Sequence, residues 1–342
     1  MPDYYFTGSG YYLRELNILY KMMPGPPPEP LYSFRGNMKS VHCILPVINE
    51  TNELLYVGTN SGQVHVWDLK LKREKIKHEV GNEACLCITF NNNIFITQQK
   101  GESIKFWKEN IEGVWKLQKI LNHDYCGFCK MGLLDCFIIL PSNGSSIALY
   151  DFVSNKEIIQ AANKKLGEIM CLKVINSIKC ILVCYESGIL SLWNMDWSCL
   201  YETKVTEDCP MAIDYCDLTC EGILGTNNNR LLKFKLCDNK KISIVGEMNI
   251  TNPGVSSVAI NEKGKLCVIG CWDGRLRYYT MKKLKLLAVL THHSGSIDDI
   301  VFVNLNLSFC DSGLVIAGGK DTKVSLWNLY CEYMNEFVKN KT

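Results

Sequence analysis

A histidine and three cysteines that lie close together in the sequence are residue types that can bind zinc. Cys126 and Cys129 have the spacing C-x-x-C, His123 precedes them and Cys136 follows. The same two cysteines resemble a redox-active pair. We expect neither site, because a predicted strand would direct Cys126 and Cys129 to opposite faces and offers no helix N-terminus to lower a thiol pKa. No second pair of ligands follows at zinc-finger spacing.

The sequence contains none of the common catalytic motifs. It has no P-loop, no glycine-rich dinucleotide motif, no nucleophile elbow and no zinc-protease motif. Asp298 and Asp299 are adjacent carboxylates, but neighbours on a strand face opposite ways and cannot easily share an acid–base task. The six histidines are scattered. We therefore expect a protein that is not an enzyme and that binds neither a cofactor nor a metal.

The composition is that of a globular protein without a strong charge bias. The 342 residues are 47% hydrophobic and 21% charged, and the formal net charge is +2. No apolar run approaches the ~18 residues of a membrane-spanning helix, and the N-terminus does not resemble a secretory signal. The 18 cysteines are therefore expected in a reducing compartment. We expect a cytoplasmic and nuclear protein with protein partners, and neither a membrane nor a nucleic-acid partner.

Short segments of alternating apolar residues that end on an aromatic recur along the chain every 40 to 48 residues. This spacing agrees with the repeat of about 40–45 residues that forms one four-stranded propeller blade. Apolar runs and hairpin turns such as Asp273-Gly274 precede the segments. The seventh copy is weaker, and either Phe234 or Lys235 holds its aromatic position. The segments are Val64–Trp67, Ile104–Trp107, Ile147–Tyr150, Leu190–Trp193, Leu231–Leu236, Leu276–Tyr279 and Val324–Trp327.

The pattern predicts an all-β fold, a seven-bladed β-propeller. The last repeat ends near Leu329 and leaves no room for a fourth strand in blade seven. The alternating segment Leu31–Arg35 precedes the first repeat, so we expect it to complete blade seven and close the ring. The expected divisions are an N-terminal extension with a proline-rich spacer (1–30), the propeller (31–330) and a C-terminal tail (331–342). Leu13, Leu16, Tyr20 and Met23 could line one face of a short helix in the extension.

The repeats resemble the WD-repeat family. Trp67-Asp68 matches the dipeptide that gives the family its name, and Trp193-Asn194 and Trp327-Asn328 are close to it. The resemblance implies a WD40-type propeller in which a turn aspartate, a histidine, a hydroxyl and the tryptophan form a polar network within a blade. Blade seven keeps His293, Asp321 and Trp327 of this network, with Ala317 where we expect the hydroxyl. Blade six keeps only Asp273, and the other blades lack the network.

Several segments resemble one subgroup, the guanine nucleotide-binding protein subunit beta-like protein 1 family, whose fungal counterparts are ASTRA-associated WD-repeat proteins. The resemblance covers about residues 23–330 and implies a non-enzymatic scaffold or adaptor. The family is associated with the ASTRA complex and with the TTT co-chaperone, which matures phosphatidylinositol 3-kinase-related kinases. No G-protein gamma subunit is expected, because the chain lacks a long N-terminal coiled-coil helix. The segments that carry the resemblance are Met23–Pro30, Phe34–Gly36, Val41-His42, Ile250–Val255, Gly270–Asp273, Leu286–Leu290 and Ala317–Tyr330.

Two surfaces are candidates for partner contact. Trp272 belongs to the inner turn of blade six, where the family exposes residues at the mouth of the central channel, and Arg275 lies near it. Lys282 and Lys283 belong to a face that the repeat pattern makes basic, against a more acidic opposite face. Two alternatives to the scaffold remain: a reader of modified peptides such as histone tails, with an acidic and aromatic pocket around Trp272, and an accessory subunit of a nucleic-acid-modifying enzyme.

Overall fold

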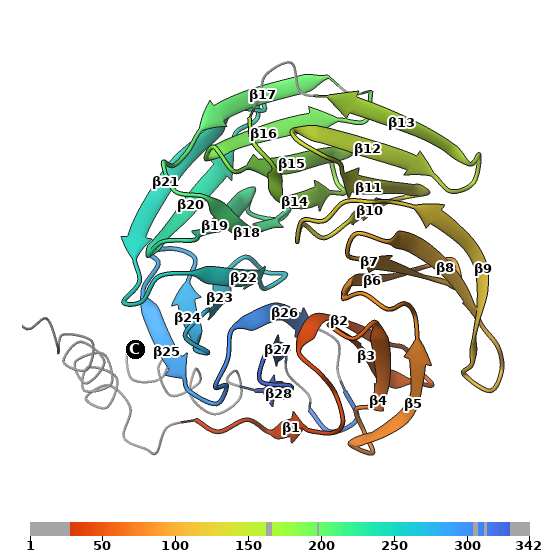
Figure 1. The fold of residues 1–342 in the computed structure, drawn as a ribbon. Helices are drawn as coiled ribbons and strands as arrows, with labels where there is room; N and C mark the ends of the chain where they lie inside the picture. Colours follow the sequence, from red (N-terminus) through yellow and green to blue (C-terminus); the bar gives the residue numbers. More distant parts are fainter. Residues whose placement is uncertain (1–27, 162–165, 197, 304–306, 311–312, 329–342) are drawn as a thin grey trace, which may run out of the picture.

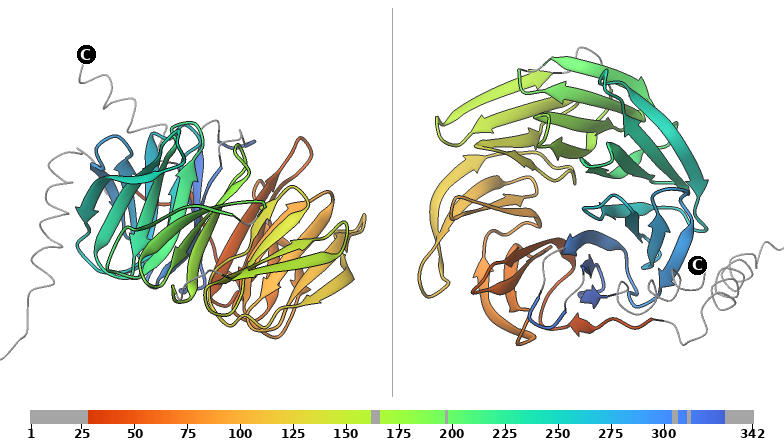
Figure 2. Two further views of the ribbon diagram at one scale, coloured as in Figure 1. Left: turned by 90° about the horizontal axis from the view of Figure 1, so that it is seen from above. Right: turned by 180° about the vertical axis from the view of Figure 1, so that it is seen from behind.

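Seven four-stranded antiparallel sheets stand around a common axis and form a closed β-propeller (Figure 1). The computed structural model describes residues 28–161, 166–196, 198–303, 307–310 and 313–328, and this part of the chain contains no helix. Figure 2 shows the same ring from its edge and from behind. The all-β, seven-bladed prediction is confirmed.

In blades one to six the four strands follow one another in the chain, from the inner strand beside the channel to the outer strand, and only the outer strand of blade seven, β1 (Tyr32–Phe34), comes from elsewhere in the sequence. They are β2 (Val41–Ile48), β3 (Glu53–Thr59), β4 (Gln63–Asp68) and β5 (Arg73–Glu79) in blade one; β6 (Cys85–Asn91), β7 (Ile94–Gln99), β8 (Ser103–Glu109) and β9 (Trp115–Asn122) in blade two; β10 (Gly132–Leu134), β11 (Phe137–Pro141), β12 (Ser146–Asp151) and β13 (Lys156–Ala161) in blade three; β14 (Ile169–Ile175), β15 (Cys180–Tyr185), β16 (Ile189–Asn194) and β17 (Cys199–Lys204) in blade four; β18 (Pro210–Cys216), β19 (Glu221–Thr226), β20 (Arg230–Leu236) and β21 (Ile242–Asn249) in blade five; β22 (Val255–Ile260), β23 (Leu266–Cys271), β24 (Leu276–Thr280) and β25 (Leu286–Leu290) in blade six; and β26 (Ile297–Val303), β27 (Leu314–Gly319), β28 (Val324–Trp327) and β1 (Tyr32–Phe34) in blade seven.

The first strand of the propeller sequence closes the ring. β1 pairs antiparallel with β28, and Tyr32 lies opposite Leu326. The side chain of Phe34 is fully buried, and its ring centroid lies 5.0 Å from that of Trp67 in blade one. The predicted closing strand is therefore confirmed, and it ties blade seven to blade one through side-chain packing as well as through the ladder.

The hydrophobic core is divided into seven clusters, and each cluster lies between two neighbouring blades. The aromatic residue at the end of each third strand packs against the preceding blade. Trp67 packs on blade seven, Trp193 on blade three and Trp327 on blade six. A single blade would expose both of its apolar faces to water, so each sheet depends on its two neighbours for burial.

Phe234, and not Lys235, holds the aromatic position of the weak repeat in blade five. A β-bulge between the third and fourth strands immediately precedes Trp67, Trp107 and Trp193, and the corresponding bulge lies between Lys233 and Phe234. Phe234 is fully buried, whereas Lys235 is exposed. Phe234 therefore takes the place of the tryptophan in packing against blade four.

Blade seven contains a continuous polar chain of four side chains. Trp327 Nε1 donates to Ser325 Oγ at 2.7 Å, Ser325 Oγ lies 2.7 Å from His293 Nε2, and His293 Nδ1 lies 2.8 Å from Asp321 Oδ1. Since Ser325 Oγ already accepts a proton from Trp327, its own proton serves His293 Nε2, and Nδ1–H then donates to Asp321. All four residues are therefore held in one orientation.

The hydroxyl of this chain is not where the sequence analysis placed it. Ala317 holds the expected position on β27, and Ser325, directly opposite on β28, supplies the oxygen instead. An equivalent hydroxyl is also present in two blades that we expected to lack the network. Thr97 on β7 accepts from Trp107 Nε1 at 2.9 Å, and Ser191 on β16 accepts from Trp193 Nε1 at 2.7 Å. Residues opposite each other in a ladder point to the same face, so either strand can supply this oxygen.

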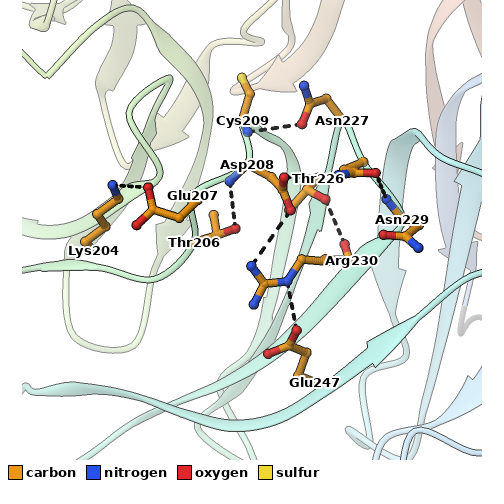
Figure 3. A network of polar contacts seen from close by, with 11 residues as sticks. Lys204, Thr206, Glu207, Asp208, Cys209, Thr226, Asn227, Asn229, Arg230 and Glu247 are labelled. Carbon is orange, nitrogen blue, oxygen red and sulfur yellow. Dashed lines mark hydrogen bonds and ion pairs between the residues drawn. The ribbon is translucent and has the colours of Figure 1, made fainter.

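Blades five and six have arginine ion pairs on their third strands. In blade six the fully buried Arg277 binds Asp273, with Nη2 2.8 Å from Oδ2. In blade five Arg230 Nε donates to Glu247 at 2.8 Å, and Nη1 lies 3.9 Å from Asp208 in the preceding loop (Figure 3). These charged pairs link the turn ends of their blades where the histidine network is missing.

Blade three departs most from the repeat. Its inner strand β10 has three residues, and a loop, residues 123–131, precedes it. Cys126 and Cys129 lie in this loop and not on a strand, so the strand placement expected for them is wrong. Cys126 is exposed and Cys129 is buried. Among the described residues, no group of three or more histidine, cysteine or acidic side chains could hold a metal ion.

Some predictions fall on the ends of the chain. The proposed short helix of Leu13, Leu16, Tyr20 and Met23 and the tail 331–342 lie outside the described residues. Within the described part, the search for a helix long and apolar enough to cross a membrane finds none.

Candidate partner-binding site at the channel mouth

All seven blades line one cavity of 650 Å³ in the central channel. Six blades contribute residues from their inner strands. Blade three contributes the loop 123–131 instead, because β10 is too short to do so. The cavity opens on the face that carries the turns between second and third strands, among them the turn of Trp272.

Lys130 of the blade-three loop reaches across the channel. Its ammonium lies 2.7 Å from Asp299 Oδ1 on β26 of blade seven, and the Ile44 N–H of blade one donates to Asp299 Oδ2 at 2.8 Å. Burial alone would lower the pKa of Lys130, but the Asp299 carboxylate reverses the effect, so the pKa is raised. The pair stays charged at neutral pH and joins three blades across the axis.

Asp298 and Asp299 do not face opposite ways, contrary to the expectation from their sequence. A β-bulge at Ile297–Asp299 interrupts the alternation of β26, and both carboxylates line the same cavity. Asp298 Oδ1 accepts from Ser296 Oγ at 2.7 Å, and its Oδ2 lies 3.6 Å from His42 Nδ1. Each carboxylate thus has its own internal partners, and the two do not share a proton.

His42 of blade one is held in its neutral form. Burial lowers its pKa most, Asp298 opposes this, and the nearby charges of Lys130, Lys320 and Lys100 lower the pKa further. Three ammonium groups and one carboxylate thus act on His42 from this part of the channel.

The opposite part of the cavity contains its large apolar side chains, beside the polar Glu168, Ser256 and Ser257. Met170 and Met211 line it from blades four and five, and Trp272 from blade six. The Trp272 indole is 46% exposed and lies flat on Gly254. A Cβ at residue 254 would come within 2.1 Å of the indole, and the backbone φ is +91°, so only glycine fits beneath the ring.

Phe128 is a second exposed aromatic side chain at the mouth, at 62% exposure. Its ring centroid lies 6.4 Å from that of His42 and 3.5 Å from the Lys100 ammonium. The loop that carries it is fixed on both sides. Gln98 Nε2 donates to the Cys129 carbonyl at 3.1 Å, and Tyr125 OH donates to the Ile169 carbonyl of blade four at 2.8 Å.

The four residues named from the sequence as candidate contacts do not form one site. Trp272 and Arg275 lie in the turn between β23 and β24, where Arg275 binds Asp273 at 3.0 Å. Lys282 and Lys283 lie exposed in the loop between β24 and β25, at the opposite end of β24. Loops equivalent to that of Lys282 also carry exposed basic residues, Lys70, Lys72, Lys240 and Lys241.

Phe128, Lys130, His42 and Lys320 at the channel mouth were missed by the sequence analysis. His42 and Lys320 come from two blades, and Phe128 and Lys130 come from the loop that replaces part of a strand in a third, so no spacing connects them. The one available signal was the break in the repeat before blade three. Burial raises the pKa of the Cys171 thiol, which lines the cavity, well above the ordinary value.

Comparisons with known proteins agree with this geometry. A profile of the family "WD domain, G-beta repeat" matches residues 28–68, 244–280 and 284–328, which cover blade one, blade six and blade seven with its closing strand. The chain carries WD40 repeats.

Two similar proteins match most of the length of the chain, and a third matches part of it. Guanine nucleotide-binding protein subunit beta-like protein 1 of Mus musculus is 27% identical over 330 residues, which are 89% of this chain and 97% of the relative. ASTRA-associated protein 1 of Schizosaccharomyces pombe is 21% identical over 377 residues, 89% of this chain and 99% of the relative. The corresponding protein of Schizosaccharomyces japonicus is 27% identical over 135 residues, 39% and 35% of the two chains.

Proposed function

We propose that this WD-repeat protein is a non-enzymatic scaffold in an ASTRA-like assembly. Within it, the protein supports the maturation of phosphatidylinositol 3-kinase-related kinases by the TTT co-chaperone. The observation that carries this is similarity over 89% of the chain to a protein named for its association with ASTRA. The propeller supports the scaffold role, because binding residues stand on loops of a rigid frame.

The face with the channel mouth is the binding face in this proposal. It exposes Trp272 and Phe128 beside one cavity, and exposed aromatic residues over a concave site favour partner contact. No group on this face has the arrangement of an activated nucleophile or a shared acid–base pair among the described residues. We propose that the protein works in the cytoplasm and the nucleus, which imaging of a tagged chain in its own cells would test.

Affinity purification with quantitative mass spectrometry tests the scaffold role. The tagged full chain should recover TTT components from its own cells. A double variant Trp272→Ala, Phe128→Ala should recover much less, because it removes the exposed aromatic groups of the mouth. The matched control Lys282→Glu, Lys283→Glu changes the opposite end of β24 and should recover TTT components normally. Absence of TTT components from the wild-type sample would contradict the proposal.

A further inference from the structure

The charged groups of the mouth differ in whether they already have partners. Asp299 holds Lys130 and the Ile44 N–H, and Asp298 accepts from Ser296. These carboxylates are therefore already occupied within the protein. A cationic ligand side chain would have to displace internal partners to reach them, at the cost of leaving Lys130 unpaired.

Two ammonium groups near the same rim have no carboxylate partner among the described residues. Lys320 lines the cavity from blade seven, is exposed, and has no ion pair within the described ranges. The Lys100 ammonium, in the turn between β7 and β8 of blade two, lies 3.5 Å from the centroid of the Phe128 ring. Glu168, the other exposed carboxylate of the cavity, belongs to blade four on the far side and accepts from the Gly144 N–H at 3.1 Å. The rim near blades seven and two is thus open to an anion.

The remaining lining accepts an apolar side chain. Met170, Met211 and Trp272 present thioethers and an indole, and Val258 extends this surface on β22. Methionine side chains adapt to irregular apolar ligands. A cavity of 650 Å³ is large enough for a bulky aliphatic or aromatic side chain together with the backbone on either side of it.

We infer that the cavity binds a protein segment that inserts one large apolar side chain against Met170, Met211 and Trp272 and places an acidic residue beside Lys320. This inference rests on the proposed scaffold function and specifies its partner chemistry. It differs from a reader of modified lysine, because the carboxylates that such a reader needs are occupied by Lys130 and Ser296. The blade-three loop supports the site by holding Phe128 and Lys130 in place.

Selection from a random peptide display library on the full chain tests the inference. Enriched peptides should share a leucine, methionine or phenylalanine with an aspartate or glutamate nearby. Synthetic fluorescent versions should bind Trp272→Ala about thirty-fold more weakly, the loss expected for an interface tryptophan. They should bind Lys320→Glu about five-fold more weakly, because an exposed ion pair is replaced by repulsion.

The controls separate binding from folding. Trp272→Phe keeps an aromatic ring and should restore most of the affinity, and Lys282→Glu should bind like the wild type. Replacing the acidic residue of the peptide with lysine should weaken binding by a similar factor of about five. Enrichment of lysine-rich peptides, no enrichment, or equal binding to Trp272→Ala in a normally folded chain would overturn the inference. If the wild-type chain still recovered TTT components in any of these cases, the scaffold proposal would stand without it.

Discussion

Blade seven and blade three depart from the common blade in opposite ways. Blade seven borrows its outer strand β1 from the start of the propeller sequence and joins His293, Asp321, Ser325 and Trp327 in one polar chain. The inner strand of blade three has only three residues, and the loop before it lines the channel instead. Blade seven, which closes the ring, is therefore held by an extended hydrogen-bond network. Blade three, whose inner strand is short, supplies residues of the candidate site.

Histidines in the loops before the two blades show the same contrast. His293 lies between Asp321 and Ser325, so both ring nitrogens have partners. His123 is buried, and its Nε2 has no hydrogen-bond partner in the described part of the chain. The histidine of blade seven thus stabilises its blade through two hydrogen bonds. The histidine of blade three leaves a buried Nε2 without a partner among the described residues, at a cost in stability.

Removing β1 should produce the largest effect. A chain that begins at Gly36 loses the ladder to β28 and the buried Phe34, whose burial alone is worth about 3–5 kcal/mol. Denaturant unfolding should show a large loss of stability or no cooperative transition. A chain that begins at residue 28 retains β1 and is the control. Equal stability of the two chains would show that closure does not depend on β1.

Asp321→Asn should have the second-largest effect on stability. Burial alone would raise the pKa of Asp321, but the hydrogen bond from His293 lowers it from 3.8 to about 2. The charged carboxylate therefore contributes about 2 kcal/mol at neutral pH, estimated from the shift. Because the folded-state pKa is depressed, this contribution is present above about pH 4 and is lost as the pH falls toward 2. The difference in unfolding free energy between the wild type and Asp321→Asn should therefore be smaller at pH 4 than at pH 7.

The carboxylate change to compare in blade three is Asp151→Asn, at the end of the third strand. Asp151 accepts from the Val153 N–H and from Ser154 in its own hairpin, and the exposed contact with the Cys136 thiol adds to these. Its replacement should therefore cost less than that of Asp321. A larger cost for Asp151→Asn than for Asp321→Asn would reverse the proposed difference between the two blades.

Gln98→Ala should loosen the blade-three loop at a smaller cost. The buried Gln98 side chain donates to the Cys129 carbonyl and accepts from the Met131 N–H at 2.8 Å. Its loss leaves both backbone groups without these partners, worth between about 1 and 2 kcal/mol. Hydrogen exchange at Met131 should accelerate. The exposed Gln118→Ala is the control, and unchanged exchange at Met131 in Gln98→Ala would show that Gln98 does not anchor the loop.

His123 should give the smallest effect, visible only in its pH dependence. Burial lowers the pKa of His123, partly opposed by Asp124. The unfolded chain then binds a proton more readily than the folded one, so stability falls as the pH drops below about 6.5. His123→Leu should lose less stability than the wild type between pH 7 and pH 5.5, measured by chemical denaturation. A steeper loss in the variant would mean that the histidine is protonated in the fold.

The seven repeats and the closing strand could be read from the sequence, because period-two alternation and aromatic positions survive in every blade. Phe234 shows the limit, since only the bulge before it decided its register. The hydroxyl of blade seven was misplaced because Ser325 and Ala317 are opposite in the ladder, where either position reaches Trp327. A linear pattern does not show which of two cross-strand neighbours carries an atom.

The channel mouth could not be assembled from the sequence for a different reason. Trp272 was found because its turn belongs to the repeat. Phe128 and Lys130 lie in a loop that replaces regular structure, and the partners of Lys130 lie in blades seven and one. Asp298 and Asp299 were assigned to opposite faces because the alternation rule holds only for a strand without a bulge.

The pairing of β1 with β28 has a consequence for synthesis on the ribosome. Tyr32 emerges early, but its partner Leu326 appears only after all seven blades have been translated, which takes on the order of tens of seconds. Until then β1 has no partner strand. The face of blade one on which Trp67 packs is not yet covered by blade seven and Phe34. Protection of that face by other proteins during translation would therefore matter more for this chain than for one whose sheets are completed in order.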